Sequence, residues 1–156
     1  MTSGQTPSQR LAELGIELPA VPAAAGSYLP TARTGDLVYT AGQLPLVAGR
    51  LLATGKVGGQ VTPEEANKLA RQCALNVLAA VHAEVGVDSI VRVVKVVGFV
   101  ASAPGFNGQP GVVNGASDLF AEVLGEAGRH ARSAVGVSEL PLDAPVEVEA
   151  IVQVRS

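Results

Sequence analysis

The side chains that most often carry chemistry are few in this chain and stand far apart. Its 156 residues include one cysteine, Cys73, and two histidines, His82 and His130. Neither histidine belongs to an HxxxH or HExxH pattern, and no glycine cluster has the spacing of a nucleotide-binding loop. We therefore expect no metal site and no loop that cradles a nucleotide phosphate. Cys73 lies among apolar residues, which predicts a small buried side chain, and His82 is predicted to lie on the surface.

Carboxylates near the end of the chain are candidates for acid–base chemistry. Residues 146–154 alternate between apolar and polar types, which is typical of a strand with one buried face. Glu147 and Glu149 both belong to the polar face and stand about 6.6 Å apart along the strand. Taken alone, Glu147 is interpreted as a solvated strand residue, and Glu149 is given a structural role.

Helix and strand signals predict an α+β domain that positions these residues. Thr62, Pro63 and Glu65 supply the N-cap, the first-turn proline and the capping-box glutamate of a helix that ends at Gly86. The other predicted elements are a short helix over residues 8–14, a hairpin of strands 28–33 and 37–41, a short strand near 43–47, a central strand over 90–101, a second helix from 112 to about 124, and last strands over 133–138 and 146–154.

This order of elements predicts a mixed sheet with two helices packed on one face. The 47% hydrophobic content is enough for one core, so residues 26–156 are expected to form one domain. Residues 1–25 are interpreted as an N-terminal appendage with a short helix. The second face of the sheet is semi-polar and has no cover within the chain, so we expect a homo-oligomer.

Charge and hydropathy exclude several classes of partner. The net charge is −3 and the Lys and Arg residues are scattered singly, so nucleic acid is not an expected partner. No uninterrupted apolar stretch reaches the roughly 20 residues of a membrane-spanning helix. The first 19 residues lack the pattern of a signal peptide, and one cysteine forms no internal disulfide. We therefore expect a cytoplasmic protein without a membrane partner.

Motifs at both ends of the chain make a more specific pattern. The N-terminal motifs are Gly26-Ser27-Tyr28 and Gly35-Asp36-Leu37-Val38-Tyr39-Thr40-Ala41-Gly42-Gln43-Leu44-Pro45. The C-terminal motifs are Ala131-Arg132-Ser133-Ala134-Val135-Gly136-Val137, Leu140-Pro141-Leu142-Asp143 and Val146-Glu147-Val148-Glu149-Ala150-Ile151. In this order, the segments resemble the RidA (YjgF/YER057c/UK114) family, also labelled endoribonuclease L-PSP, over roughly residues 26–154.

The resemblance implies both a fold and an activity. The implied fold is the chorismate-mutase-like α+β fold, in which three subunits join their sheets into a barrel with sites in the clefts between subunits. The implied activity is hydrolysis of 2-imino acids and 2-aminoacrylate, released by pyridoxal-phosphate enzymes, to 2-keto acids and ammonia. The implied ligand is thus a small carboxylate metabolite, and no cofactor takes part.

The resemblance also implies roles for individual residues. Arg132 matches the arginine that anchors the substrate carboxylate, a task for which its planar fork of donors is suited. Glu147 matches the glutamate that holds or activates water near the imine carbon. Tyr28 matches a tyrosine that lines the pocket with its ring and offers its hydroxyl as a polar group.

Two further positions match the substrate-binding part of the pocket. Gly42 matches a glycine whose missing side chain lets a backbone amide approach the ligand. Asn114 matches a pocket-lining asparagine, although capping of the second helix is an equal alternative for it.

The chain also departs from the family pattern. Ala134, a further substrate-binding candidate, stands where many members have Cys, and Ala41 stands where many have Ser. Ser27, Leu29 and Pro30 alter the wall beside Tyr28. The N-terminal extension before Gly26 and the Gly/Pro-rich loop of residues 105–111 resemble a longer-chain branch of the family. Two alternative functions stay open: a non-catalytic protein that binds small carboxylates in the same cleft, and the endoribonuclease of the family label, which the acidic charge balance disfavours.

Overall fold

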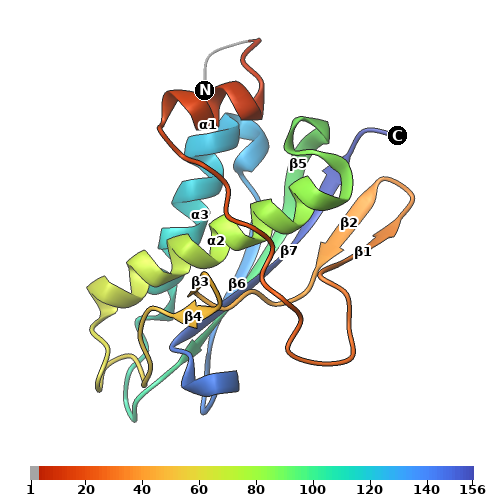
Figure 1. Ribbon diagram of the computed structural model, residues 1–156. Helices are drawn as coiled ribbons and strands as arrows, with labels where there is room; N and C mark the ends of the chain where they lie inside the picture. Colours follow the sequence, from red (N-terminus) through yellow and green to blue (C-terminus); the bar gives the residue numbers. More distant parts are fainter. Residues whose placement is uncertain (1–3) are drawn as a thin grey trace.

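The computed structural model describes residues 4–156 and contains a five-stranded mixed sheet in the order β1-β2-β7-β5-β6 (Figure 1). The strands of this sheet are β1 (Thr31–Thr34), β2 (Leu37–Thr40), β5 (Ile90–Ala101), β6 (Ala131–Val137) and β7 (Val146–Val154). Neighbouring strands run antiparallel except β5 and β6, which are parallel and are joined by a helical crossover. Strand β6 lies at one edge of the sheet and pairs with β5 alone.

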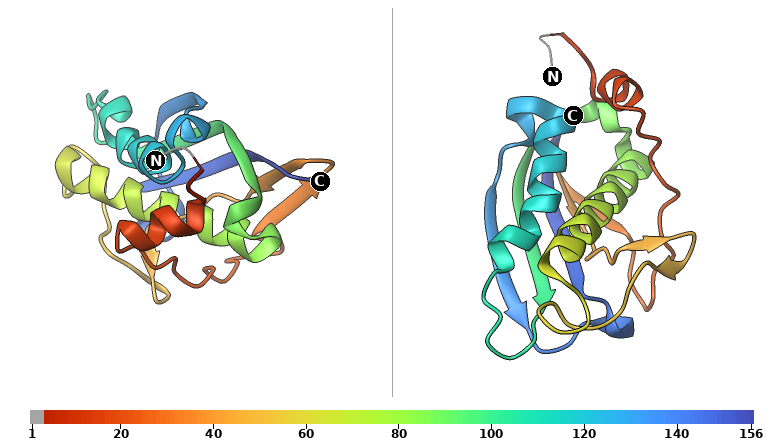
Figure 2. Two further views of the ribbon diagram at one scale, coloured as in Figure 1. Left: turned by 90° about the horizontal axis from the view of Figure 1, so that it is seen from above. Right: turned by 90° about the vertical axis from the view of Figure 1, so that its left-hand side faces the viewer.

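Two long helices, α2 (Pro63–Val85) and α3 (Gln109–Leu124), cover one face of this sheet (Figures 1 and 2). The α2 helix begins as predicted, because the Thr62 hydroxyl accepts a hydrogen bond from the Glu65 amide at 3.1 Å. The core lies between the helices and the sheet. Along β7 every second residue is buried, beginning with Val146, while Glu147 and Glu149 are only partly buried. The predicted alternation is thus confirmed.

The remaining elements are short. They are α1 (Pro7–Glu13), the hairpin β3 (Leu46–Val47) and β4 (Arg50–Leu51), and the 3-10 turns η1 (Val87–Ser89), η2 (Gly125–Gly128) and η3 (Pro141–Asp143). The α1 helix packs through the buried Leu11, and its Ser8 amide donates to the Asp88 carboxylate at 2.8 Å. The chain then crosses the outer side of α2 on its way to β1 (Figure 1).

The start of α3 differs from its prediction. The helix begins at Gln109, three residues before the predicted start, because Pro110 in the first turn has no amide that needs a partner. Asn114 consequently lies inside the helix, and the alternative that it caps α3 is wrong. The predictions that Cys73 is buried and that His82 is exposed are confirmed. No helix in the described residues 4–156 has the length and hydropathy needed to cross a membrane.

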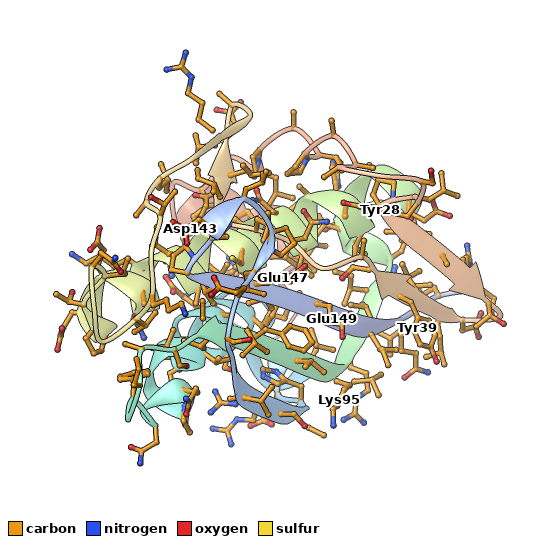
Figure 3. All side chains as sticks on the ribbon, turned by 90° about the horizontal axis from the view of Figure 1, so that it is seen from below. Tyr28, Tyr39, Lys95, Asp143, Glu147 and Glu149 are labelled. Carbon is orange, nitrogen blue, oxygen red and sulfur yellow. The ribbon has the colours of Figure 1, made fainter. Side chains whose placement is uncertain are left out.

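The face of the sheet opposite the helices carries a mixture of apolar and charged side chains. Figure 3 shows Glu147 and Glu149 along β7, with Tyr39 of β2 on one side and Lys95 of β5 on the other. Tyr39 is 43% exposed, and Val135 on the edge strand β6 is 42% exposed. We call this surface the open face.

Candidate functional site

Arg132 is held by α3 on the helix-covered side of the sheet edge. Its Nη1 donates to the side-chain oxygen of Asn114 at 2.7 Å and to the Ser117 hydroxyl at 3.1 Å. Its Nη2 donates to the Pro110 carbonyl at 3.3 Å. An arginine has five N–H donors, so these three bonds fix the guanidinium and leave two donors for a ligand. Such a pair of donors suits a carboxylate.

An open hollow of about 370 Å³ lies beside Arg132. It is lined by the C-terminal half of α3, the end of η2 and the start of β6, through Ser117, Asp118, Ala121, Gly128, Arg129, His130 and Arg132. Two arginines and one carboxylate line the hollow, so its charge favours small anions. Ala134 follows Arg132 on the same side of β6 and packs against the core.

Glu147 and Gly42 form a second cluster, on the open face. Gln43 and Val148 exchange two backbone hydrogen bonds, at 2.8 and 3.0 Å, which fix Gly42 beside Glu147. A β-carbon at Gly42 would lie 2.8 Å from Cδ of Glu147, so only glycine leaves room for the carboxyl group. Gly42 therefore has a packing role that the sequence did not indicate.

Asn76 supports this cluster from inside the core. It is fully buried on α2 and donates from one amide group to the carbonyls of Leu44 and Leu46, at 3.0 Å each. These bonds hold the segment that carries Gly42 against the helix. Sequence reasoning missed Asn76, although an asparagine within an otherwise apolar helix face was a usable signal.

The environment of Glu147 favours its protonated form. Burial raises the pKa of the Glu147 carboxyl, and the nearby charge of Glu149 raises it further. A carboxyl group with a raised pKa gives up and takes back a proton more readily near neutral pH than an ordinary glutamate does. Glu147 is thus suited to proton transfer with a bound water molecule.

Tyr28 lies beside the second cluster. Its hydroxyl accepts a hydrogen bond from the Ala25 amide at 3.0 Å, and the residue is 49% exposed. Tyr28 and Gly42 line the same small cavity of about 40 Å³, together with Leu142 of η3. Figure 3 places Tyr28 on the same side of the molecule as Glu147.

The sheet separates the two clusters within one subunit. Arg132 pairs with Val96, which is buried under the helices, whereas Glu147 pairs with Phe99, whose side chain points to the other face. Residues that are paired across a sheet share a face, so Arg132 and Glu147 point to opposite sides. Within one chain, Arg132 therefore contacts Asn114 and Glu147 contacts Gly42, but the two pairs lie on opposite faces of the sheet.

Within residues 4–156, no three His, Cys, Asp or Glu side chains are grouped so that they could hold a metal ion.

The Ser117–His130 pair beside Arg132 is the second feature that sequence reasoning missed. Ser117 lies three residues after Asn114 on α3, and this spacing places both on one helix face.

Comparisons with known proteins agree with the motifs. A family model described as "YjgF/chorismate mutase-like, putative endoribonuclease" matches residues 8–152. Protein TCP17 of Trypanosoma cruzi is 45% identical over 148 residues, which are 94% of this chain and 92% of that protein. The 2-iminobutanoate/2-iminopropanoate deaminase of Dermatophagoides farinae is 31% identical over 141 residues, which are 90% of this chain and 95% of that protein.

Solved structures show the same fold. The crystal structure of Atu1372 from Agrobacterium tumefaciens is 47% identical with a TM-score of 0.88, covering 97% of this chain and 94% of that one. The crystal structure of E. coli TdcF with bound serine is 29% identical with a TM-score of 0.63, covering 90% and 96%. The predicted chorismate-mutase-like α+β fold is confirmed. The chain therefore belongs to the YjgF/chorismate mutase-like family, which includes the RidA-type proteins.

Proposed function

We propose that this protein hydrolyses small 2-imino and enamine acids to 2-keto acids and ammonia in the cytoplasm. The observation that carries the proposal is the fixed Arg132 guanidinium, which keeps two N–H donors for a carboxylate beside an open hollow. A relative with a deaminase name and a relative that binds serine, which has a carboxylate group, support the same ligand class.

The reaction needs only water and proton transfers. An enamine acid first gains a proton on its β-carbon and loses one from nitrogen, which gives the imine. Water then adds to the carbon of the C=N bond, and the resulting carbinolamine loses ammonia to leave the C=O bond of the keto acid. Glu147 would accept a proton from the attacking water and return it to the leaving nitrogen. General acid–base catalysis of this kind contributes roughly 10²- to 10⁴-fold in rate. The raised pKa of Glu147 supports this role.

We further propose a homotrimer in which the catalytic cleft lies between subunits. Arg132 and Glu147 point to opposite faces of one sheet, so a common site requires Arg132 of one copy and Glu147 of another. The open face has no helix of its own to cover it within the described residues, and it exposes apolar groups such as Tyr39. Burial of that face by neighbouring copies supports the assembly.

The direct test couples the purified protein to an amino-acid oxidase that releases imines, and follows the formation of ammonia and keto acid. We expect faster release with the parent protein than with Arg132→Lys or Glu147→Gln. The same rates for all three proteins, equal to the rate without any of them, would refute the deaminase proposal. Binding of pyruvate without turnover would favour the alternative of a non-catalytic carboxylate-binding protein.

Mixed trimers test the cleft between subunits. Arg132→Lys and Glu147→Gln chains, each inactive alone, should regain activity when they are unfolded and refolded together. Random mixing of equal amounts gives an intact Arg132 and an intact Glu147 in about a quarter of the sites. No recovery in trimers of confirmed mixed composition would contradict a shared site, and a monomeric mass would contradict the trimer.

The endoribonuclease named in the family description is a weaker candidate. The chain has a net charge of −3, and the only cations at the hollow are Arg129, Arg132 and, when protonated, His130. Few phosphates can be neutralised by such a surface, so we expect negligible RNA binding at physiological salt. Salt-sensitive RNA affinity in the sub-micromolar range would reverse this order of candidates.

A further inference from the structure

A chain of hydrogen bonds runs behind the guanidinium of Arg132. Arg132 Nη1 donates to the Ser117 hydroxyl at 3.1 Å, and this hydroxyl lies 2.9 Å from Nε2 of His130. The other ring nitrogen of His130, Nδ1, lies 2.6 Å from the carbonyl oxygen of Gly128. The first two bonds connect a candidate substrate anchor to a titratable group that the proposed reaction does not use, and the third fixes that group to the backbone.

The direction of each bond follows from the chemistry of its ends. A carbonyl oxygen only accepts, so Nδ1 of His130 carries a hydrogen and donates to Gly128. In the neutral imidazole Nε2 then has a lone pair, and the Ser117 hydroxyl donates to it. Arg132 only donates, so Ser117 accepts from it. Neutral His130 thus orients the Ser117 hydroxyl, and Ser117 holds Nη1.

We propose that Ser117 and His130 are positioning residues for Arg132, and that protonation of His130 strengthens the binding of a small carboxylate at Arg132. The first part concerns the protein alone, whereas the second rests on the proposed function, because the carboxylate is that of the proposed substrate. In the first part both residues act through Arg132, because Ser117 accepts from Nη1 and His130 orients Ser117.

Protonation of His130 reverses one bond of the chain. Nε2 then carries a hydrogen and donates to Ser117, so the Ser117 proton is released toward the hollow, where it can reach an anion. The imidazolium also adds a positive charge beside Arg132. For a partly solvated pair of charges we expect these two changes to tighten carboxylate binding by roughly 3- to 10-fold.

The surroundings of His130 determine the pH at which its ring becomes protonated. The ring is partly buried against the edge of the Phe120 ring, with centroids 5.9 Å apart. Burial lowers the pKa of His130, the Gly128 carbonyl raises it, and the charge of Arg132 lowers it again, with a net shift below the ordinary value of 6.5.

Two further charged groups line the hollow beside His130, and one of them pairs with a third. Asp118 of α3 lines the same hollow, and Arg129 interacts with Glu126 of η2 at 3.6 Å. The lowered pKa keeps His130 neutral at pH 7, and the ring takes up a proton as the pH falls below the ordinary pKa of a histidine.

The two histidines of the chain allow a test of the bond direction by NMR. His82 accepts a hydrogen bond from the Val87 amide at Nδ1, so its neutral form carries the hydrogen on Nε2. We expect the ¹⁵N spectrum above pH 7 to show the opposite tautomer for His130, with the hydrogen on Nδ1. A hydrogen on Nε2 of neutral His130 would overturn the proposed chain. Arg132→Gln should raise the pH at which His130 titrates and leave His82 unchanged, and an unmoved His130 would exclude the coupling.

Calorimetric titration with pyruvate between about pH 5 and 8 tests the effect on binding. Parent protein and the control His82→Gln should bind 3- to 10-fold more tightly at the acidic end, whereas His130→Gln should lose this dependence. Ser117→Ala should bind more weakly at every pH, and Ser117→Thr, which retains the hydroxyl, should restore binding. An unchanged pH dependence in His130→Gln refutes the second part of the proposal. Absence of pyruvate binding to the parent refutes the proposed function and with it the second part, while the NMR result still decides the first.

Discussion

Replacing Gly42 by alanine tests whether the position of the Glu147 carboxyl group controls turnover. A β-carbon at Gly42 would lie 2.8 Å from Cδ and 3.1 Å from Cγ of Glu147, and would overlap Oε1. Non-bonded carbon atoms prefer about 3.5–4.0 Å, so the carboxyl group must move by roughly 1 Å. Gly42 does not have a positive φ, so alanine adds no backbone strain.

The expected loss is large in rate and small in stability. A misplacement of about 1 Å can cost roughly 10²-fold in rate, so imine hydrolysis by Gly42→Ala should fall by about that factor. The partly buried Glu147 can rotate away at a cost of about 0.5–1.5 kcal/mol in the free energy of unfolding. In the proposed cleft the carboxylate is held by Arg132 of another copy, which the added methyl group does not displace, so affinity for pyruvate should change less than about twofold.

The assay compares imine-dependent ammonia release, calorimetric affinity for pyruvate and urea denaturation. Gly59→Ala is the matched control, because a β-carbon at Gly59 makes ordinary contacts, 3.4 Å from the Lys56 carbonyl oxygen and 3.7 Å from the β-carbon of Ala103. The double variant Gly42→Ala/Glu147→Ala should regain stability without regaining turnover. Parental turnover by a folded Gly42→Ala protein would refute the reasoning, since the Glu147 position would then be irrelevant.

Three further predictions concern single side chains. Arg132→Lys should weaken pyruvate binding by roughly 10- to 100-fold, because a point charge replaces the two-pronged donor; parental affinity in calorimetry would contradict the anchor. Glu147→Gln should raise the free energy of unfolding at pH 7 by up to about 1 kcal/mol. Because the pKa of Glu147 is raised in the folded protein, the unfolded chain loses the carboxyl proton first as the pH rises above 4.5. The parent protein therefore loses stability as the pH rises through this range, whereas the glutamine variant does not. Equal pH dependence of the two unfolding free energies in urea denaturation would contradict this prediction. Burial raises the pKa of the Cys73 thiol, so a thiol reagent should label it only on unfolding, and rapid labelling of folded protein would disprove this.

The fold was predictable where local signals and burial agree. The β-branched run over residues 90–101 defines β5 to the residue, because a strand buried on its helix face requires such side chains. The alternation over residues 146–154 likewise defines β7. The start of α3 was missed because Gly108, Pro110 and Gly111 have low helix propensity, which the packing of Val112 and Val113 against the core overrides.

The site was predictable only as separate residues. Motif matching selected Arg132, Asn114, Glu147 and Gly42, but the pairing of Arg132 with Asn114 depends on the crossover that lays α3 over β6. The opposite orientation of Arg132 and Glu147 depends on strand register across β5. Register follows from the sheet as a whole, so neither relation is contained in a short motif.

The contact between Ser117 and His130 depends on Gly128, for which local sequence rules predict a different role. A glycine at the end of a helix ordinarily marks its C-terminus, and Gly125 does so for α3. Gly128 has another reason to be glycine: a β-carbon there would lie 2.8 Å from the Ala121 amide nitrogen and overlap the Phe120 carbonyl. Only a residue without a β-carbon can pack so close to α3. This close packing places the Gly128 carbonyl oxygen 2.6 Å from Nδ1 of His130. Backbone packing at Gly128 thus sets the orientation of the imidazole, and through it that of the Ser117 hydroxyl behind Arg132. Gly128 is near Ser117 in the sequence, but the contact exists only once η2 has folded back on α3.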